Sequence, residues 1–203
     1  VWLAAGAALA VLFGLGWSFS RGDGRQLEPA AARGDLIRFR LTSPLGYRIP
    51  PGGPRLAVSP DGQHVAFVTH VEPAVGRRVW IQSVDSPTPR AVPGSEEAFD
   101  VFWSPDSQSI AFIAVGMLRT LHLASGAMVA LGPADGSSGG AWSRQSGLLV
   151  TSQDADGLVL YPPDGGSPVP VTTPDRARDE RMHRFPQFLP DGRRFIYFAQ
   201  SRP

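Results

Sequence analysis

The sequence predicts an all-β protein: a partial, open β-propeller of about four blades, preceded by one transmembrane α-helix. Three observations predict this architecture. A short motif recurs at intervals of about forty residues, 23 glycines and 20 prolines stand among 203 residues, and the first nineteen residues carry no charge. Many short strands joined by tight turns use a composition of this kind.

Residues 1–20 are predicted to form the membrane helix. A helix rises about 1.5 Å per residue, so the uncharged run Val1–Phe19 nearly spans a hydrocarbon layer of about 30 Å. Trp2 and Trp17 lie near its ends, where interfacial aromatic residues occur. A cleaved signal peptide is the alternative, but the segment has no basic n-region and its apolar run is longer than usual.

Residues 21–35 are rich in Ala, Gly and Arg and are interpreted as a juxtamembrane linker. Because the chain begins with Val, we expect it to be a piece of a longer protein with another part beyond the helix. By the positive-inside rule, Arg21, Arg25 and Arg33 place the following region in the cytoplasm. Only a more basic flank before Val1 would put the propeller outside.

Within the predicted propeller, residues 36–203, four thirteen-residue segments align without gaps. Their fourth positions are Ser59, Ser104, Ser143 and Leu189, which recur every 39 to 46 residues. A period of about forty residues without helices is typical of one four-stranded propeller blade per repeat. The aligned segments are Leu56–Val68, Val101–Ile113, Gly140–Ser152 and Pro186–Phe198, and the blades are expected at about 56–98, 99–139, 140–184 and a truncated 185–203.

Each repeat predicts two core strands joined by a tight turn. In Ser-Pro-Asp-Gly, Pro fixes φ at the second position and Gly accepts a positive φ at the fourth. An almost continuously apolar strand comes next, as expected if neighbouring blades cover both of its faces. The turn residues singled out are Ser59, Pro60, Asp61, Gly62, Ser104, Pro105, Asp106, Ser143, Pro190, Asp191 and Gly192.

The recurring aspartates could form a ring of carboxylates, but a structural role is favoured. Asp in such a turn accepts hydrogen bonds from its own backbone, and whole blades would separate Asp61, Asp106 and Asp191. The fourth repeat ends after its second core strand, so we expect an open edge. Strand Leu36–Leu41 is then a partner reserved for a final blade.

The S-P-D-G/S turn followed by an apolar-Ala-Phe strand resembles the TolB-like, WD-repeat-like β-propellers. The uncharged helix, the Arg-rich linker, the strand Asp35–Leu41 and the late FPQFLPDGRRFIYFA repeat are together similar to the propeller ectodomain of bacterial serine/threonine protein kinases. In those proteins the kinase domain precedes the helix. The resemblance implies a single-pass protein of the bacterial inner membrane, whose periplasmic or extracellular propeller binds a protein, peptide or glycan.

No catalytic function is predicted for the chain itself. It contains no lysine, no H-R-D and no D-F-G, so a kinase active site is excluded. Gly136–Gly140 matches G-x-S-x-G, but a loop precedes Ser138 and a strand is expected after it, so it is interpreted as an inter-blade loop. Two alternatives stay open: the propeller of a prolyl oligopeptidase-type peptidase and a free periplasmic TolB-like interaction module. A kinase domain before Val1 or a hydrolase domain after Pro203 would distinguish them.

Composition also argues against several partners. The net charge of +1 with interspersed charges gives no electrostatic case for nucleic acid, and the absence of cysteine excludes thiolate metal sites. The histidines lack metal-ligand spacing, so no metal or cofactor is expected. The charged stretch Pro174–Arg184 is predicted to be a solvated loop that contacts the ligand. Trp80, Trp103 and Trp142 are predicted to pack in the core or between blades.

Two readings of the membrane helix stay open: its small residues could allow it to pair, or their spacing could reflect only an Ala/Gly-rich composition. Gly6, Ala10 and Gly14 are spaced by four and lie on one helical face, which permits close approach of two helices and a homodimer. Gly6→Ile and Gly14→Ile should therefore abolish the signal of residues 1–20 in a membrane two-hybrid assay. An unchanged signal would mean that the spacing reflects composition and that the helix is only an anchor.

Overall fold

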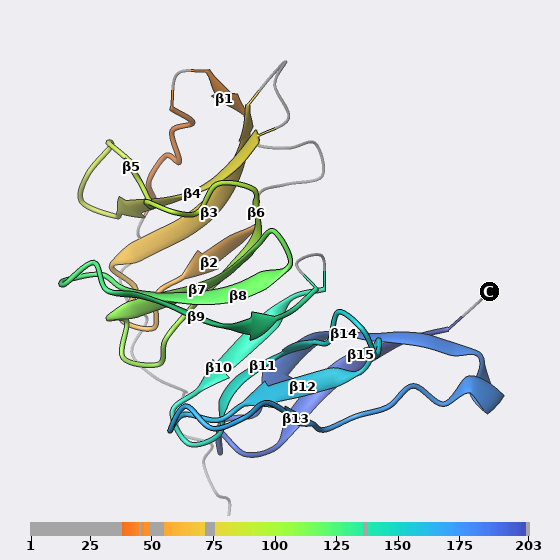
Figure 1. The fold of residues 1–203 in the computed structure, drawn as a ribbon. Helices are drawn as coiled ribbons and strands as arrows, with labels where there is room; N and C mark the ends of the chain where they lie inside the picture. Colours follow the sequence, from red (N-terminus) through yellow and green to blue (C-terminus); the bar gives the residue numbers. More distant parts are fainter. Residues whose placement is uncertain (1–37, 45, 49–54, 72–75, 136–137, 202–203) are drawn as a thin grey trace, which may run out of the picture. The chain divides into compact units, whose positions relative to one another are not determined.

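The computed structural model describes residues 38–44, 46–48, 55–71, 76–135 and 138–201, and all of its described strands are antiparallel. The strands form four sheets (Figure 1). The first contains β1 (Tyr47–Arg48), β2 (Leu56–Val58), β3 (His64–Val71), β4 (Gly76–Ser83) and β5 (Arg90–Ala91); the second contains β6 (Ala98–Trp103), β7 (Ser109–Ala114), β8 (Met117–His122) and β9 (Met128–Pro133). The third contains β10 (Gly140–Ser143), β11 (Gly147–Thr151), β12 (Leu158–Tyr161) and β13 (Val169–Pro170); the fourth contains β14 (Glu180–Phe188) and β15 (Phe195–Ser201).

The order of strands within each sheet is that of a propeller blade. In the second and third sheets each strand pairs with the next one along the chain, and β2 to β5 take the same course in the first sheet. One repeat therefore builds one sheet. The predicted all-β class with several antiparallel sheets is confirmed.

The predicted membrane helix, with Gly6, Ala10 and Gly14, and the linker 21–35 lie outside the described residues and stay predictions. Among the residues that the structure describes, no helix is long and apolar enough to cross a membrane. The described part contains a single 3-10 turn, η1 (Arg176–Arg178).

The core hairpin of the third repeat differs from the others by one residue. The third motif position pairs with the tenth in three repeats, as in Trp103↔Ile110, but Trp142 pairs with Leu148, the ninth. The gapless alignment is therefore wrong here, because the third turn lacks Pro-Asp-Gly and closes earlier. At Gly147, φ is +97° and a Cβ would lie 2.1 Å from the Tyr161 carbonyl oxygen, so only glycine fits this shorter turn.

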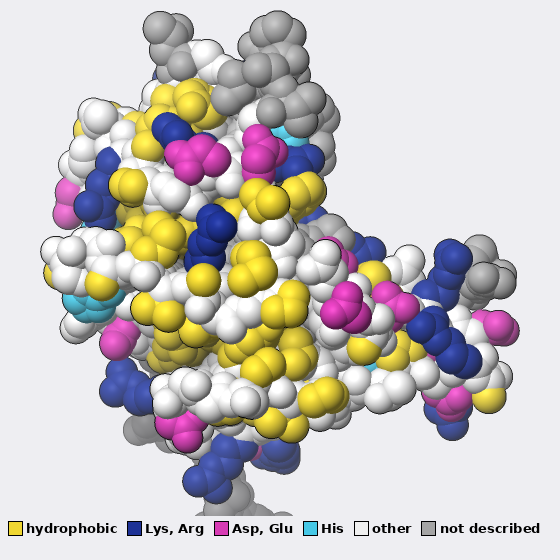
Figure 2. Space-filling view, in the orientation of Figure 1, with side chains coloured by type: hydrophobic (Ala, Val, Ile, Leu, Met, Phe, Trp, Pro, Cys, Tyr) yellow, Lys and Arg dark blue, Asp and Glu magenta, His cyan; other side chains and the backbone are white. Residues whose placement is uncertain are grey.

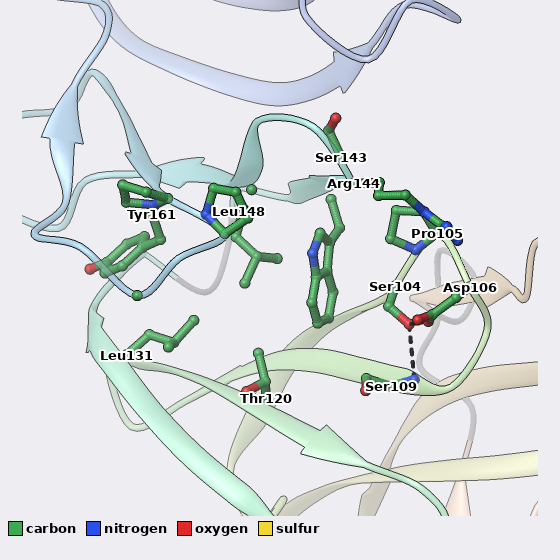
Figure 3. Close-up of a pocket in the computed structure, with 15 residues that line it drawn as sticks. Ser104, Pro105, Asp106, Ser109, Thr120, Leu131, Ser143, Arg144, Leu148 and Tyr161 are labelled. Carbon is green, nitrogen blue, oxygen red and sulfur yellow. Dashed lines mark hydrogen bonds between the residues drawn. The ribbon is translucent and has the colours of Figure 1, made fainter.

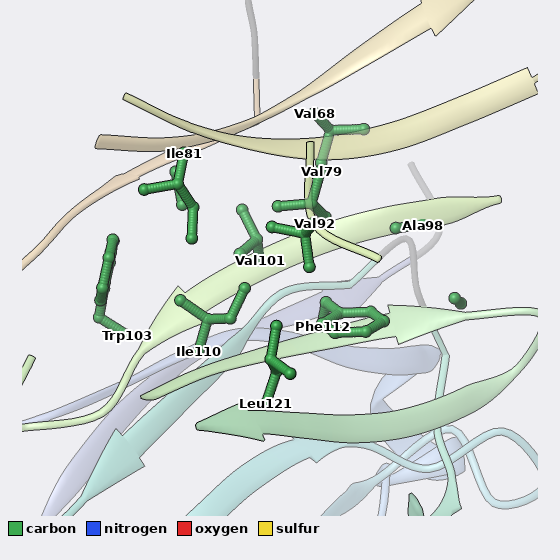
Figure 4. Packing of buried hydrophobic residues seen from close by; sticks show 12 residues of the cluster. Val68, Val79, Ile81, Val92, Ala98, Val101, Trp103, Ile110, Phe112 and Leu121 are labelled. Atoms are coloured by element: carbon green, nitrogen blue, oxygen red, sulfur yellow. The ribbon is translucent and has the colours of Figure 1, made fainter. Parts of the chain in front are cut away.

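The hydrophobic core lies between sheets. One cluster joins the first and second sheets, and Ile110 and Phe112 of β7 lie in it (Figure 4). Ala111 and Ile113 of the same strand face a second cluster, shared with the third sheet. All four are fully buried, which explains why β7 is apolar at consecutive positions. Each large apolar side chain buried in this way contributes about 1.5–3 kcal/mol.

The strand predicted at Asp35–Leu41 is not present in its described part. Residues 38–41 carry no strand pairing. The side-chain amide of Gln82 instead donates to the Arg40 carbonyl at 3.0 Å, and the Thr42 N–H donates to the Gln82 carbonyl oxygen at 3.4 Å. The buried side chain of Gln82 thus forms the hydrogen bonds with the backbone of Arg40 and Thr42 that a neighbouring β-strand would form if this segment were a strand.

Apolar side chains are exposed on the outer strands and on β15. Figure 2 shows hydrophobic side chains gathered on the face that carries β9 and β13, whose exposed members include Val129 and Val169. On β15, Phe198 is 55% exposed, whereas Ile113 at the equivalent position of the second repeat is fully buried. In the described residues β15 pairs only with β14, so one of its edges and one apolar surface are open.

This open strand predicts self-association of the full chain in detergent, which keeps residues 1–20 from driving aggregation. Phe198→Lys should weaken the association by about tenfold or more, because it places a charge on the apolar surface that pairs. Size-exclusion chromatography with light scattering measures this. Val129→Lys, at a residue 54% exposed on β9, is the matched control. A stable wild-type monomer, or equal effects of both substitutions, would contradict the role of β15.

Candidate binding site

The repeated turns are closed by the side chains that the sequence singled out. In the first turn, the Ser59 hydroxyl donates to the carboxylate of Asp61, which also accepts from the Gln63 N–H at 3.0 Å. The Ser59 hydroxyl accepts from the His64 N–H at 2.9 Å. Pro60 and Gly62, with φ of +72°, complete the turn.

The second turn repeats this arrangement. Ser104 donates to Asp106 at 2.6 Å, Asp106 accepts from the Gln108 N–H at 3.0 Å, and Ser104 accepts from the Ser109 N–H at 2.9 Å. Pro105 comes after Ser104 in the turn. Hydrogen bonds to the carboxylate favour its charged form, and the pKa of Asp106, like that of Asp61, lies below its ordinary value mainly because of the serine hydroxyl.

The fourth turn, Pro190-Asp191-Gly192, comes after Leu189 instead of a serine. Asp191 accepts from the backbone N–H groups of Arg193 and Arg194 at 3.0 and 2.9 Å and from the Arg194 side chain. The Arg193 N–H is the largest of the effects that lower the pKa of Asp191 to about 2. The aspartates of these turns therefore act on their own backbone.

Hydrogen bonds tie some neighbouring turns together. The Asp61 N–H donates to the Ser107 hydroxyl at 3.0 Å, which links the first and second sheets. The buried Ser143 and the nearby Ser146 both donate to the Gly192 carbonyl, at 2.6 and 2.8 Å, which links the third and fourth. Within the described part, no hydrogen bond joins the turns of the second and third sheets.

A cavity of about 310 Å³ lies at that junction (Figure 3). Ser109, Thr120 and Leu131 of the second sheet form one wall, and the third sheet supplies the other. A volume of this size is at the lower end of the range for small-ligand sites. The third-sheet side chains that matter most are Trp142, Arg144, Leu148 and Tyr161.

Comparison of the repeats explains the cavity. At the ninth motif position the first repeat carries His64, whose ring lies 5.9 Å from that of Trp103 and fills the junction of the first and second sheets. The second repeat has Ser109 at this position, opposite Trp142. The small side chain leaves the corresponding space empty.

A second replacement enlarges the space. Ile81 pairs with Ala66 and lies buried in the first cluster. Its equivalent is Thr120, which pairs with Ala111. Thr120 is only half-buried and lines the cavity instead of filling it.

The tryptophans at the two junctions also differ in hydrogen bonding. The indole N–H of Trp103 donates to the Ala57 carbonyl of the preceding sheet at 2.9 Å, and that of Trp80 donates to Thr69 at 2.9 Å. Trp142 packs against the second cluster, as predicted, but its indole N–H has no hydrogen-bond partner among the described residues. The indole N–H of Trp142 can therefore donate a hydrogen bond to a ligand in the cavity.

Other polar groups of the cavity are available too. In the described part of the chain, the hydroxyls of Ser109 and Thr120 and the guanidinium of Arg144 make no hydrogen bond. Tyr161 is buried, and its hydroxyl already donates to the Pro133 carbonyl at 2.8 Å. Burial raises the pKa of this phenol. The cavity thus combines free hydrogen-bonding groups with an apolar wall.

The ligand loop predicted at Pro174–Arg184 is wrong in its second half. Strand β14 begins at Glu180, and His183 is 1% exposed. Its Nδ1 lies 2.7 Å from the Thr172 hydroxyl and its Nε2 lies 3.1 Å from Glu180. The ring therefore holds β14 in place. The charged residues around His183 in the sequence, Arg181 and Arg184 among them, concealed this role.

Asp100 and Ser138 have structural rather than catalytic roles. Asp100 is largely buried, which raises its pKa, and the Arg55 guanidinium at 3.2 Å and the Gly139 N–H counteract this effect. Ser138 of the G-x-S-x-G match is buried and donates to Asp135 at 2.7 Å. Strand β10 comes directly after it, so the helix of a nucleophile elbow is not there. Gly136 and Ser137 lie outside the described residues.

No protein-family model and no curated protein sequence matches the chain. Solved structures do match. TolB from Acinetobacter baumannii has a TM-score of 0.57 at 13% identity over 72% of this chain and 37% of that one. A putative TolB from Agrobacterium tumefaciens has a TM-score of 0.58 at 18% identity over 72% and 54%. A chain of the mitotic checkpoint complex has a TM-score of 0.51 at 19% identity over 72% and 46%.

These structural similarities assign the chain to a fold class. The chain has the architecture of a TolB-like β-propeller, as the repeats predicted. It spans about a third to a half of the length of the TolB structures that it matches. At these identities the likeness extends to the fold alone.

The bonding of the turns predicts how Asp106 titrates. Ser104→Ala should raise the pKa of Asp106 toward its ordinary value of 3.8, while Asp61 in the equivalent turn stays unchanged and serves as control. Because the folded-state pKa lies below the unfolded one, this carboxylate stabilises the protein above about pH 4, and the contribution is lost as the pH falls. Carboxyl NMR titration measures both groups. An unshifted Asp106 would show that the hydroxyl does not set its pKa.

Proposed function

We propose that this chain is a non-catalytic β-propeller binding module and the sensor of a membrane-anchored bacterial serine/threonine protein kinase. One observation carries the binding role. Between the second and third sheets, a cavity presents Trp142, Ser109 and Thr120 with unused hydrogen-bonding groups on rigid strands. Groups held in this way bind a ligand without first being ordered, which lowers the entropic cost of binding.

The cavity is suited to binding more than to chemistry. A serine or threonine hydroxyl becomes a nucleophile only beside a general base. No histidine lines the cavity, and the side-chain hydroxyl that donates to the carboxylate of Asp106 is that of Ser104, not that of Ser109 or Thr120. Ser109 and Thr120 can donate and accept hydrogen bonds as they stand.

The sensor role rests on sequence features, two of which lie outside the described residues. The uncharged run of residues 1–20, the Arg-rich linker and the late FPQFLPDGRRFIYFA repeat support it. In this proposal the propeller lies outside the bacterial inner membrane. Capture of a protein, peptide or glycan by two propellers brings two helices together through Gly6, Ala10 and Gly14, and with them two cytoplasmic kinase domains.

A free periplasmic TolB-like interaction module is the second candidate. The two TolB matches over 72% of the chain favour it. In this second candidate the propeller also binds a ligand. The two candidates differ in what precedes residue 1, which is a kinase domain only in the sensor. A peptidase propeller would also use this fold, and it would be distinguished by a hydrolase domain after residue 203.

Thermal shift on the full chain in detergent tests the binding role with a defined panel of short peptides, oligosaccharides and amino acids. At least one probe should raise the Tm, since a ligand at a hundred times its Kd stabilises the native state by about 2.7 kcal/mol. The double variant Ser109→His, Thr120→Ile should abolish the shift. It fills the cavity with the residues that the first repeat uses at the same positions.

Thr88→Ile is the matched control, because Thr88 is exposed in the loop between β4 and β5. Mass spectrometry of the bound probe tests for turnover. The proposal fails if no probe shifts the Tm, if the filled variant responds like the wild type, or if the probe is chemically converted.

A further inference from the structure

The inter-sheet cavity has a charged end and an apolar end. In Figure 3, Asp106, Arg144 and Pro105 lie on one side of the view, and Leu131, Leu148 and Tyr161 lie on the other. Leu148 and Tyr161 are each 4% exposed, so the apolar end is well covered. A ligand that fills the cavity must itself be amphipathic.

The charged end presents one charge of each sign. Asp106 is ionised at neutral pH, as an exposed carboxylate ordinarily is, and its Oδ1 is the atom that accepts from Ser104 and Gln108. Its Oδ2 accepts no hydrogen bond within the described part of the chain. Arg144 is exposed and forms no direct ion pair with Asp106 or with any other described residue, although its charge contributes to lowering the pKa of Asp106.

Two separate opposite charges select against most charged ligands. A purely anionic ligand would pair with Arg144 but leave the charge of Asp106 without a partner, and a purely cationic one would do the reverse. A ligand that carries an ammonium and a carboxylate satisfies both, through charge-assisted hydrogen bonds. A neutral sugar can hydrogen-bond to both side chains but carries no charge to compensate either, and it would place hydroxyl groups against Leu131 and Leu148.

The middle of the cavity fits the same kind of molecule. Ser109 and Thr120 each offer a hydroxyl, and Trp142 offers an N–H donor. These groups match a carboxylate or peptide carbonyl oxygen that lies between the charged and apolar ends. The volume of about 310 Å³ suits one or two residues.

We propose that this cavity binds a small zwitterion, a free α-amino acid or dipeptide with a bulky apolar side chain. Asp106 receives the ammonium group, Arg144 receives the carboxylate, and the side chain lies against Leu131, Leu148 and Trp142. The inference rests on the proposed binding function and names the ligand class of that site.

Calorimetric titration of the full chain in detergent tests the proposal with leucine, phenylalanine and leucyl-leucine. N-acetyl-leucine lacks the ammonium, leucinamide lacks the carboxylate, and maltose is the neutral polyol. At least one zwitterion should bind, and each capped form of leucine should bind about tenfold more weakly or worse, because one charge in the site loses its partner. Maltose should not bind.

Two single variants assign the charges. Arg144→Gln should remove the preference for leucine over leucinamide, and Asp106→Asn should remove the preference for leucine over N-acetyl-leucine. Asn keeps the oxygen that accepts from Ser104, so the turn is retained. Arg181→Gln, at an exposed arginine of β14, is the matched control and should leave every affinity unchanged.

Each contrary result has a distinct meaning. Equal binding of leucine and its capped forms overturns the zwitterion site, as does binding that survives both Arg144→Gln and Asp106→Asn. If an oligosaccharide or a longer peptide binds and these zwitterions do not, this inference is wrong and the proposed binding function stands. If no probe of either series binds, both are wrong.

Discussion

The apolar residues of this protein are buried between neighbouring sheets, and each sheet depends on the next for its stability. Phe112 and Ile113 are adjacent in β7, yet they belong to two different clusters because the strand is covered on both faces. The stability of the fold is therefore distributed over a series of junctions. A substitution at one junction is therefore expected to act first on the two sheets that share it.

The cavity is a direct result of this arrangement. The first junction is filled by His64 and Ile81, and a hydrogen bond from Trp103 closes it. At the second junction the smaller Ser109 and Thr120 leave space, and the donor of the equivalent tryptophan stays unused. The same backbone thus produces a packed contact at one junction and a pocket at the next.

Much of the fold could be predicted from the sequence, because Pro and Gly fix the turns and the apolar pattern fixes the strands after them. The shorter hairpin at Trp142 could not, since its residues align as well without a gap as with one. His183 was misjudged because a buried histidine that pairs with Thr172 and Glu180 looks, in a charged stretch, like a solvated one. The replacement of His64 by Ser109 was visible in the aligned repeats and was the available signal for the cavity.

The one-residue difference in the third hairpin has a consequence for how such a protein can change. Each hairpin closes on itself, so the shorter turn at Gly147 does not disturb the pairing of β14 with β15. Insertions and deletions in these turns are therefore tolerated one repeat at a time. Over evolution, a chain of this design can acquire or lose a pocket at one junction while the packing at the other junctions stays the same.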